Sequence, residues 1–223
     1  PIGMKAPESV LHALPLSAPA DRPALSFPKR ATVAELRRRR DRHFREGQHD
    51  LALQIAAEVA GRDPGRESFL KHGMLLQQVG RYREALEVLR DALRFESGPA
   101  YLIPDIHLHL AYTWFLLGKR KRMGESLKRA KALRLKPRTA CNIHMTIGND
   151  YFIRRDFLAA QRSYLEAEKS ANNAMQRGRA LLNQGIALIR CWDFAAAEGP
   201  LDRALRVLKK AGHAGELAIA RSA

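Results

Sequence analysis

The residues with the most reactive side chains do not form a catalytic or metal-binding set. Cys141 and His144 are three positions apart and face the same side of a predicted helix. Two ligands do not make a zinc site, because such a site takes at least three from the protein. His107 and His109 are two positions apart on a predicted helix, so their side chains diverge and cannot share a metal ion. These pairs therefore predict packed or solvated side chains and no metal site.

Familiar catalytic motifs are also missing. The run Gly118-Lys119 to Gly124-Glu125 lacks the Gly-Lys-Ser/Thr ending of a phosphate-binding loop. Neither a Gly-x-Ser-x-Gly elbow nor a His-Glu-x-x-His pair occurs. We therefore expect a non-enzymatic protein without a cofactor.

The strongest chemical signal is positive charge. The chain carries a formal net charge of +16 at pH 7. Lys119 to Arg138 holds ten basic residues against Glu125 alone, and Lys29 to Gly47 adds a net +5. The candidate basic patch lies on one predicted helix and consists of Lys119, Arg120, Lys121, Arg122, Lys128, Arg129 and Lys131.

Two interpretations of the basic helix remain open. With Met123, Leu127, Ala130 and Leu133 as the buried stripe, the basic residues form an outer, solvated face. Alternatively, the charge attracts an acidic protein or a nucleic-acid backbone, with strong salt dependence. No aromatic residues are interleaved with the charges, which argues against base stacking.

Composition is that of a folded protein without a membrane span. Of the 223 residues, 46% are hydrophobic, and no apolar run approaches the roughly 20 residues that cross a bilayer. Cys141 and Cys191 are the only cysteines and suggest no disulfide framework. A cytoplasmic location is the simplest expectation.

The elements that position these residues are short helices. Residues 1–32 hold six of the eleven prolines and predict an extended tail. This tail is also apolar enough to dock on its own chain or on a second copy. From Ala31 onward, apolar residues recur at helical spacing, with breaks at Gly47, Asp63-Pro64-Gly65, Gly80, Ser97-Gly98-Pro99, Pro104, Gly118 and Lys136-Pro137. This pattern predicts about ten helices and no strand. Residues 212–223 predict a helix that caps the last repeat or begins another.

The helices repeat in pairs. Small residues, an aromatic residue and a following alanine recur with one spacing, as in Gly148, Phe157, Ala160 and in Gly185, Phe194, Ala197. The same pattern occurs in Phe69–Glu96 and, with Met123 in place of the alanine, in His107–Ala130. A fixed period of this kind predicts stacked two-helix repeats.

These residues resemble the tetratricopeptide repeat (TPR) family over roughly residues 33–211. The resemblance implies an all-α, right-handed superhelical solenoid of about five helical hairpins, with repeats near 33–65, 66–99, 104–137, 141–175 and 178–211. The first repeat departs from the pattern, because Arg40 stands where a small buried residue is expected.

In this family the first helix of each repeat lines a concave groove. Carried over by position, the implied groove residues are Lys71, Met74, Gln78, His109, Tyr112, Phe115, Met145, Asn149, Phe152, Asn183, Ile186 and Arg190, with Gln77, Leu116, Thr146 and Arg179 beside them. Similar grooves use asparagines to hold a peptide backbone, because one amide both donates and accepts. Met145 stands in place of a lysine that completes a carboxylate clamp in some relatives, which argues against a C-terminal carboxylate ligand. Packing between helices remains the alternative for Tyr112, Phe115 and Phe152, and ordinary solvation for the two asparagines.

The sequence thus predicts a TPR module that binds a peptide segment of a partner protein, which the basic charge suggests is acidic. A nucleic-acid-associated regulator is the second hypothesis, and self-association through the tail is a further one. No membrane partner is expected.

Overall fold

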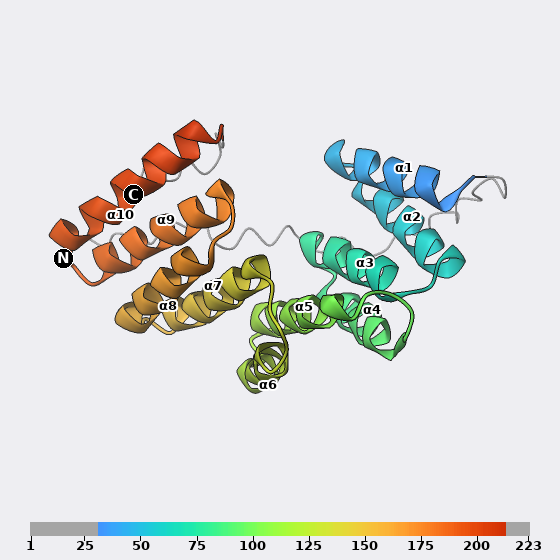
Figure 1. Cartoon of the computed structure of the whole chain (residues 1–223), viewed down its shortest axis with the longest axis horizontal. Coiled ribbons are helices and arrows are strands. Elements are labelled where there is room, and N and C mark those ends of the chain that lie inside the picture. Colours follow the sequence, from blue (N-terminus) through green and yellow to red (C-terminus); the bar gives the residue numbers. More distant parts are fainter. Residues whose placement is uncertain (1–30, 213–223) are drawn as a thin grey trace, which may run out of the picture. The chain divides into compact units, whose positions relative to one another are not determined.

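The computed structural model describes residues 31–212 (Figure 1). The described chain holds ten α-helices and no strand, as the sequence predicts. The proline-rich tail and the closing helix, expected over 1–32 and 212–223, fall almost wholly outside these residues. None of the described helices is long and apolar enough to cross a bilayer.

The chain divides between Leu102 and Ile103 into two compact units, called here the N-terminal and the C-terminal unit. In the N-terminal unit, two helical hairpins pack through α2 and α3. Its helices are α1 (Val33–Arg45), α2 (His49–Arg62), α3 (Arg66–Gln78) and α4 (Tyr82–Arg94), followed by a 3-10 turn at Ala100–Leu102.

Thr32 fixes the start of α1. Its hydroxyl accepts a hydrogen bond from the Glu35 backbone N–H, and the Glu35 carboxylate accepts one from the Thr32 N–H. This capping box satisfies two backbone donors that the helix start leaves unpaired. The first helix therefore begins where the proline-rich composition ends.

The C-terminal unit contains three hairpins. They are formed by α5 (Ile103–Leu116) with α6 (Arg120–Lys131), α7 (Pro137–Ile153) with α8 (Phe157–Ser170), and α9 (Ala174–Arg190) with α10 (Phe194–Lys210). In the stack of hairpins α5 packs on α7, whereas the last two hairpins meet mainly through α8 and α9, with a smaller contact between α7 and α9 (Figure 1). Both α7 and α9 have 17 residues and begin four residues before the expected repeat starts at 141 and 178. Pro137 in the first turn of α7 and Asn173 as the N-cap of α9 explain these earlier starts.

The turn inside each hairpin adopts the same backbone conformation. Gly47, Gly80 and Gly118 have φ of 76°, 79° and 67°, and Arg155 and Trp192 occupy the corresponding turns at φ of 64° and 63°. Glycine takes this left-handed conformation without steric cost, whereas a side chain does so at about 1 kcal/mol. The last two turns therefore keep side chains at a conformational cost.

Size complementarity joins the two helices of each hairpin. A Cβ atom placed on Gly73 would lie 2.6 Å from the Leu89 Cγ, and one on Gly148 would lie 2.5 Å from the Tyr164 Cε1. Gly185 has the same relation to Leu201, at 2.5 Å. In each case the large residue follows the glycine by sixteen positions. The small residues of the repeat pattern thus admit a large side chain from the second helix.

The first hairpin reverses this pairing. Arg40, which stands where the other hairpins have glycine or alanine, is buried, and its Nε donates to the Asp41 carboxylate at 2.9 Å. Sixteen positions later lies Ala56, which is also buried. A large residue on the first helix is therefore matched by a small one on the second, so the departure from the pattern does not prevent the hairpin from forming.

Candidate functional site

The residues predicted to line a groove lie on first helices in both units. Lys71, Met74 and Gln78 belong to α3 of the N-terminal unit. The other nine belong to α5, α7 and α9 of the C-terminal unit, where each is half-buried or exposed: His109, Tyr112, Phe115, Met145, Asn149, Phe152, Asn183, Ile186 and Arg190. Of the four flanking candidates, Gln77 and Thr146 are buried. The Thr146 hydroxyl bonds its own helix at the Asn142 carbonyl, 2.9 Å away, so it is unsuited to ligand contact.

Two equivalent polar contacts align the three first helices of the C-terminal unit. The Thr139 hydroxyl donates to the Asp105 carboxylate, which joins α7 to α5. The Gln176 side-chain amide donates to the side-chain oxygen of Asn142, Oδ1, at 3.2 Å and joins α9 to α7. Asp105 and Asn142 stand at the same position of successive repeats, as do Thr139 and Gln176. The contacts therefore recur with the repeat and fix the register of neighbouring first helices.

Asn149 is held by a buried tyrosine. The Tyr164 hydroxyl donates to the Asn149 Oδ1 at 2.9 Å, and Tyr164 is 2% exposed. Burial raises the pKa of Tyr164, so its hydroxyl stays protonated and donates at neutral pH. One lone pair of the Asn149 carbonyl is used in this bond, while both amide hydrogens remain available. A ligand carbonyl would thus meet an amide whose orientation is already fixed.

Three of the apolar residues predicted to line the groove pack against buried side chains of neighbouring helices. Met145 packs against two buried clusters, one containing Cys141 and Ala167 and the other Ala160 and Tyr164. Phe152 also packs on the second cluster, and Ile186 packs on one formed by α9 and α10. These contacts favour the packing interpretation for the three side chains, although each keeps some exposed area.

Tyr112 and Phe115 form a more accessible pair. Their rings stack at 6.2 Å between centroids with an interplanar angle of 25°. Tyr112 is 37% exposed, and Phe115 is half-buried. The exposed part of the Tyr112 ring, which is held by stacking on Phe115, is suited to hold an apolar side chain of a ligand.

The turn end of the last hairpin contains aromatic residues that the sequence analysis did not assign to a site. Trp192 is 81% and Phe194 58% exposed, and their rings meet edge to face at 6.0 Å. Nearby, the Arg190 guanidinium lies over the Phe157 ring at 5.4 Å. The available signal was Trp192 itself, which stands at a turn position that is glycine in the first three hairpins.

His109 is kept neutral by its surroundings. Burial lowers its pKa to about 4, with Asp105 opposing and Arg138 adding to this effect. An unfolded chain would protonate it near pH 6.5, its ordinary value. Burial likewise lowers the pKa of His72, His107 and His144.

We predict that acidification destabilises the protein through His109. Between about pH 6.5 and pH 4 the unfolded state binds a proton that the folded state refuses, so the free energy of unfolding falls by about 2 to 3 kcal/mol. Urea unfolding at pH 7 and at pH 4.5 measures this loss. His109→Gln should reduce the difference between the two pH values, and an unchanged difference would contradict the assignment to His109.

The basic patch is exposed along α6. All seven side chains reach solvent, although two already have partners. Arg120 donates to the Asp150 carboxylate at 2.6 Å, and the Arg122 guanidinium lies over the Trp114 ring at 4.7 Å. Met123, Leu127 and Ala130 form the buried stripe as predicted. Leu133 does not, because α6 ends at Lys131 and Leu133 is 41% exposed.

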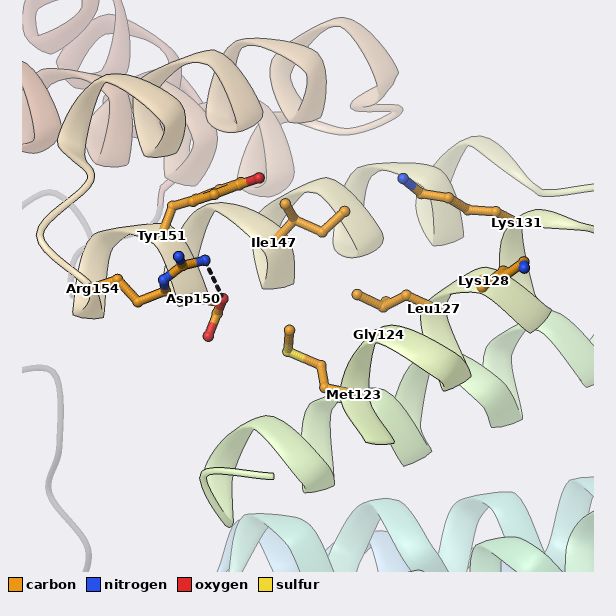
Figure 2. A pocket seen from close by; sticks show the side chains of 9 residues that line it. All are labelled: Met123, Gly124, Leu127, Lys128, Lys131, Ile147, Asp150, Tyr151 and Arg154. Atoms are coloured by element: carbon orange, nitrogen blue, oxygen red, sulfur yellow. Dashed lines mark ion pairs between the residues drawn. The ribbon is translucent and has the colours of Figure 1, made fainter. Parts of the chain in front are cut away.

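A cleft of about 380 Å³ separates α6 from α7 within the C-terminal unit (Figure 2). Met123 and Leu127 project into it from α6, facing Ile147 and Asp150 on α7. The remaining lining residues are Gly124, Lys128, Lys131, Tyr151 and Arg154. The Arg154 guanidinium lies 3.8 Å from the Asp150 carboxylate and over the Tyr151 ring at 5.6 Å. The cleft thus combines an apolar floor with a charged rim.

The cysteine and histidine pairs show no metal-binding arrangement. Cys141 is fully buried, and burial raises the pKa of its thiol to about 11. In residues 31–212, no three side chains of His, Cys, Asp or Glu are placed to hold a metal ion. Cys141 therefore behaves as a small apolar core residue.

Comparison with known proteins finds the fold rather than close relatives. No family model matches the sequence. No curated protein matches it either. Solved structures do match, at low sequence identity.

The quorum sensor NprR from B. thuringiensis, in its apo form, aligns with a TM-score of 0.72 at 11% identity, over 84% of this chain and 57% of its own. PlcR from Bacillus thuringiensis, in complex with the peptide PapR7 and DNA, aligns at 0.65 with 12% identity, over 84% of this chain and 73% of its own. MamA aligns at 0.53 with 20% identity, over 80% of this chain and 92% of its own. These neighbours are TPR-type helical repeat proteins. The paired helices, the glycine contacts between them and this similarity together show that the chain has the TPR-type helical repeat fold.

Proposed function

We propose that this protein is a non-enzymatic module that binds a peptide segment of a partner protein on the first helices of its repeats. The observation that carries the proposal is Asn149, an amide oriented by the buried Tyr164 hydroxyl on a half-exposed helix surface. The bond satisfies the buried Tyr164 hydroxyl, and it also fixes the direction of the Asn149 amide. An oriented amide loses little conformational entropy when it binds a backbone.

Asn183 extends this polar surface onto α9. It is half-buried, and α7 and α9 are kept in register by the bond between Gln176 and Asn142. Two amides on adjacent helices can pair with peptide groups of an extended ligand whatever its sequence. Side-chain preference would then come from the exposed area of Tyr112 and its neighbours.

The structural neighbours support the same class of function. PlcR was solved with the peptide PapR7, and NprR is a quorum sensor. Both share this fold over 84% of the present chain. We extend from them only the general role of a peptide-binding regulatory module.

A direct test uses selected peptides. Peptides that bind the full chain are selected from a random displayed library, and their affinities are measured by fluorescence anisotropy. Asn149→Ala combined with Asn183→Ala should weaken binding at least about tenfold, because two hydrogen bonds to the backbone are lost. Thermal unfolding should shift by only a few degrees, because Asn149→Ala removes the acceptor of the buried Tyr164 hydroxyl at a cost of about 1 to 2 kcal/mol, and Asn183 lies outside the buried core.

The matched control is Gln161→Ala combined with Asn172→Ala. It removes two amides that lie outside the first helices. This control should bind the selected peptides as the unmodified chain does. Equal affinity in the Asn149→Ala/Asn183→Ala variant would argue against the proposal.

Nucleic-acid binding is the second candidate function. Five residues of the basic patch have neither the Asp150 nor the Trp114 contact described above, and all five are exposed: Lys119, Lys121, Lys128, Arg129 and Lys131. Phosphate contacts by these residues would give affinity for duplex DNA that falls steeply with salt. The same positive charges also suit an acidic protein. The lining of the cleft beside them favours an acidic protein over a nucleic acid.

A further inference from the structure

We propose that the cleft between α6 and α7 is a second docking site, which takes an apolar side chain from an acidic peptide segment. It lies between α6, the second helix of one hairpin, and α7, the first helix of the next, and its lining includes neither Asn149 nor Asn183. The proposal therefore does not depend on the peptide-binding function proposed above.

The cleft exists because the repeat pattern is broken at two positions. In the next pair of hairpins, Ala160, Tyr164 and Ala187 form one buried cluster that joins α8 to α9. The residues 37 positions earlier are Met123, Leu127 and Asp150. A methionine and a carboxylate thus replace the two alanines that allow α8 and α9 to pack closely.

Asp150 and Met123 are both buried where they line the cleft, and a buried carboxylate requires charged or hydrogen-bonding partners. The Arg120 Nε, 2.6 Å away, and the Arg154 guanidinium, 3.8 Å away, pair with the carboxylate at one end of the cleft. This end joins α6 to α7, while the space between Leu127 and Ile147 stays open (Figure 2). Its volume of about 380 Å³ is within the range of ligand pockets.

The floor of the cleft favours an aliphatic or aromatic side chain. Met123, Leu127 and Ile147 line it with apolar atoms, and a methionine adapts its shape to different partners. Tyr151 is the single aromatic lining residue, and Arg154 lies over its ring. A nucleic-acid base would therefore find no free aromatic face among the lining residues.

The rim selects for negative charge. Lys128 and Lys131 are exposed at the end of the cleft away from Asp150 (Figure 2). They belong to the segment from Lys119 to Arg138, whose net charge is +9. A segment with carboxylates around its apolar side chain would be attracted over a distance and held at the rim by these lysines.

Gly124 offers a clean way to fill the cleft. It lies on α6 and lines the cleft, and a Cβ added to it would meet no atom within 4 Å. Replacing a helical glycine by leucine or alanine also favours the helix, so neither variant should unfold the protein. Gly124→Leu places a branched side chain in the ligand's space, and Gly124→Ala is the matched control.

The probe is a fluorescein-labelled amphipathic peptide with one leucine face and one glutamate face, measured by anisotropy with the full chain. Gly124→Leu should bind it at least about tenfold more weakly than the unmodified protein, whereas Gly124→Ala should bind normally. The Asn149→Ala/Asn183→Ala variant should also bind normally. A probe with serine in place of leucine should bind weakly if the apolar floor contributes.

A charge comparison separates the cleft from general attraction. Lys128→Glu with Lys131→Glu reverses the rim, whereas Lys121→Glu with Arg129→Glu makes the same charge change on exposed residues of α6 that do not line the cleft. The first pair should weaken the probe at least about tenfold more than the second.

Equal losses from both pairs, normal binding by Gly124→Leu, or no binding of the probe to the unmodified protein would each overturn the proposal. The proposal would also be overturned if the protein bound mixed-sequence duplex DNA in preference to the probe and Lys128→Glu/Lys131→Glu abolished the DNA complex.

Discussion

Gly148→Leu is expected to lower the free energy of unfolding by about 3 kcal/mol. A Cβ atom at this position would lie 2.5 Å from the Tyr164 ring, which is 2% exposed and cannot move aside without giving up its hydrogen bond to Asn149. Overpacking of a rigid core costs about 1 to 3 kcal/mol, and loss of the buried hydrogen bond adds about 1 kcal/mol. The better helix propensity of leucine offsets a part of this cost. Urea denaturation followed by circular dichroism measures the difference.

Gly124→Leu is the matched control for this prediction. It makes the same substitution in a helix of the same unit, but at a position where an added Cβ meets no atom within 4 Å. It should leave stability unchanged or raise it by up to about 1 kcal/mol. If both variants lose or keep stability equally, the close contact between α7 and α8 is not what requires Gly148.

Leu208→Ala is expected to destabilise the last hairpin by about 3 kcal/mol and to leave the N-terminal unit unaffected. Leu208 is fully buried, and its Cδ2 would lie 2.4 Å from a Cβ on Gly178, so truncation opens a cavity between α9 and α10. In a repeat fold each hairpin contacts only its neighbours, so damage at one end stays local. Native-state hydrogen exchange should become about a hundredfold faster in α9 and α10.

Leu36→Ala provides the reverse experiment. Leu36 is also fully buried, in the cluster that joins α1 and α2. Its truncation should accelerate exchange in these two helices and leave α9 and α10 protected. Uniform acceleration over all helices in either variant would show that the chain unfolds as one cooperative body and would contradict local behaviour.

Much of the fold could be predicted from spacing, because the contacts inside a hairpin are local and periodic. Gly73, Gly148 and Gly185 each face a large residue sixteen positions on, and this regularity is present in the sequence. Gly118 and its counterparts mark the turns for the same reason. Arg40 shows the limit of such reasoning, since it departs from the pattern and the hairpin still forms, with the small residue Ala56 at the paired position of the second helix. Pattern matching treats positions singly, whereas packing depends on the pair.

The candidate sites were only partly predictable. The basic patch was evident from composition, and the residues of the first helices followed from the family resemblance. The bond from Tyr164 to Asn149 and the cleft beside Met123 were not, because they depend on which side chains meet across helices. Met123 in place of alanine was visible in the sequence, but its consequence required Asp150, which lies on a different helix and is paired with Arg120.

By itself, the sequence determined an all-helical repeat, the turns that glycine or proline marks and the segment that carries its charge, since these depend on neighbours along the chain. The tertiary structure alone decided which polar side chains are oriented for a ligand and where two helices stay apart. Those properties arise because a buried hydroxyl and a buried carboxylate take their partners, Asn149 and Arg120, from other helices, and such partners meet only when the chain folds.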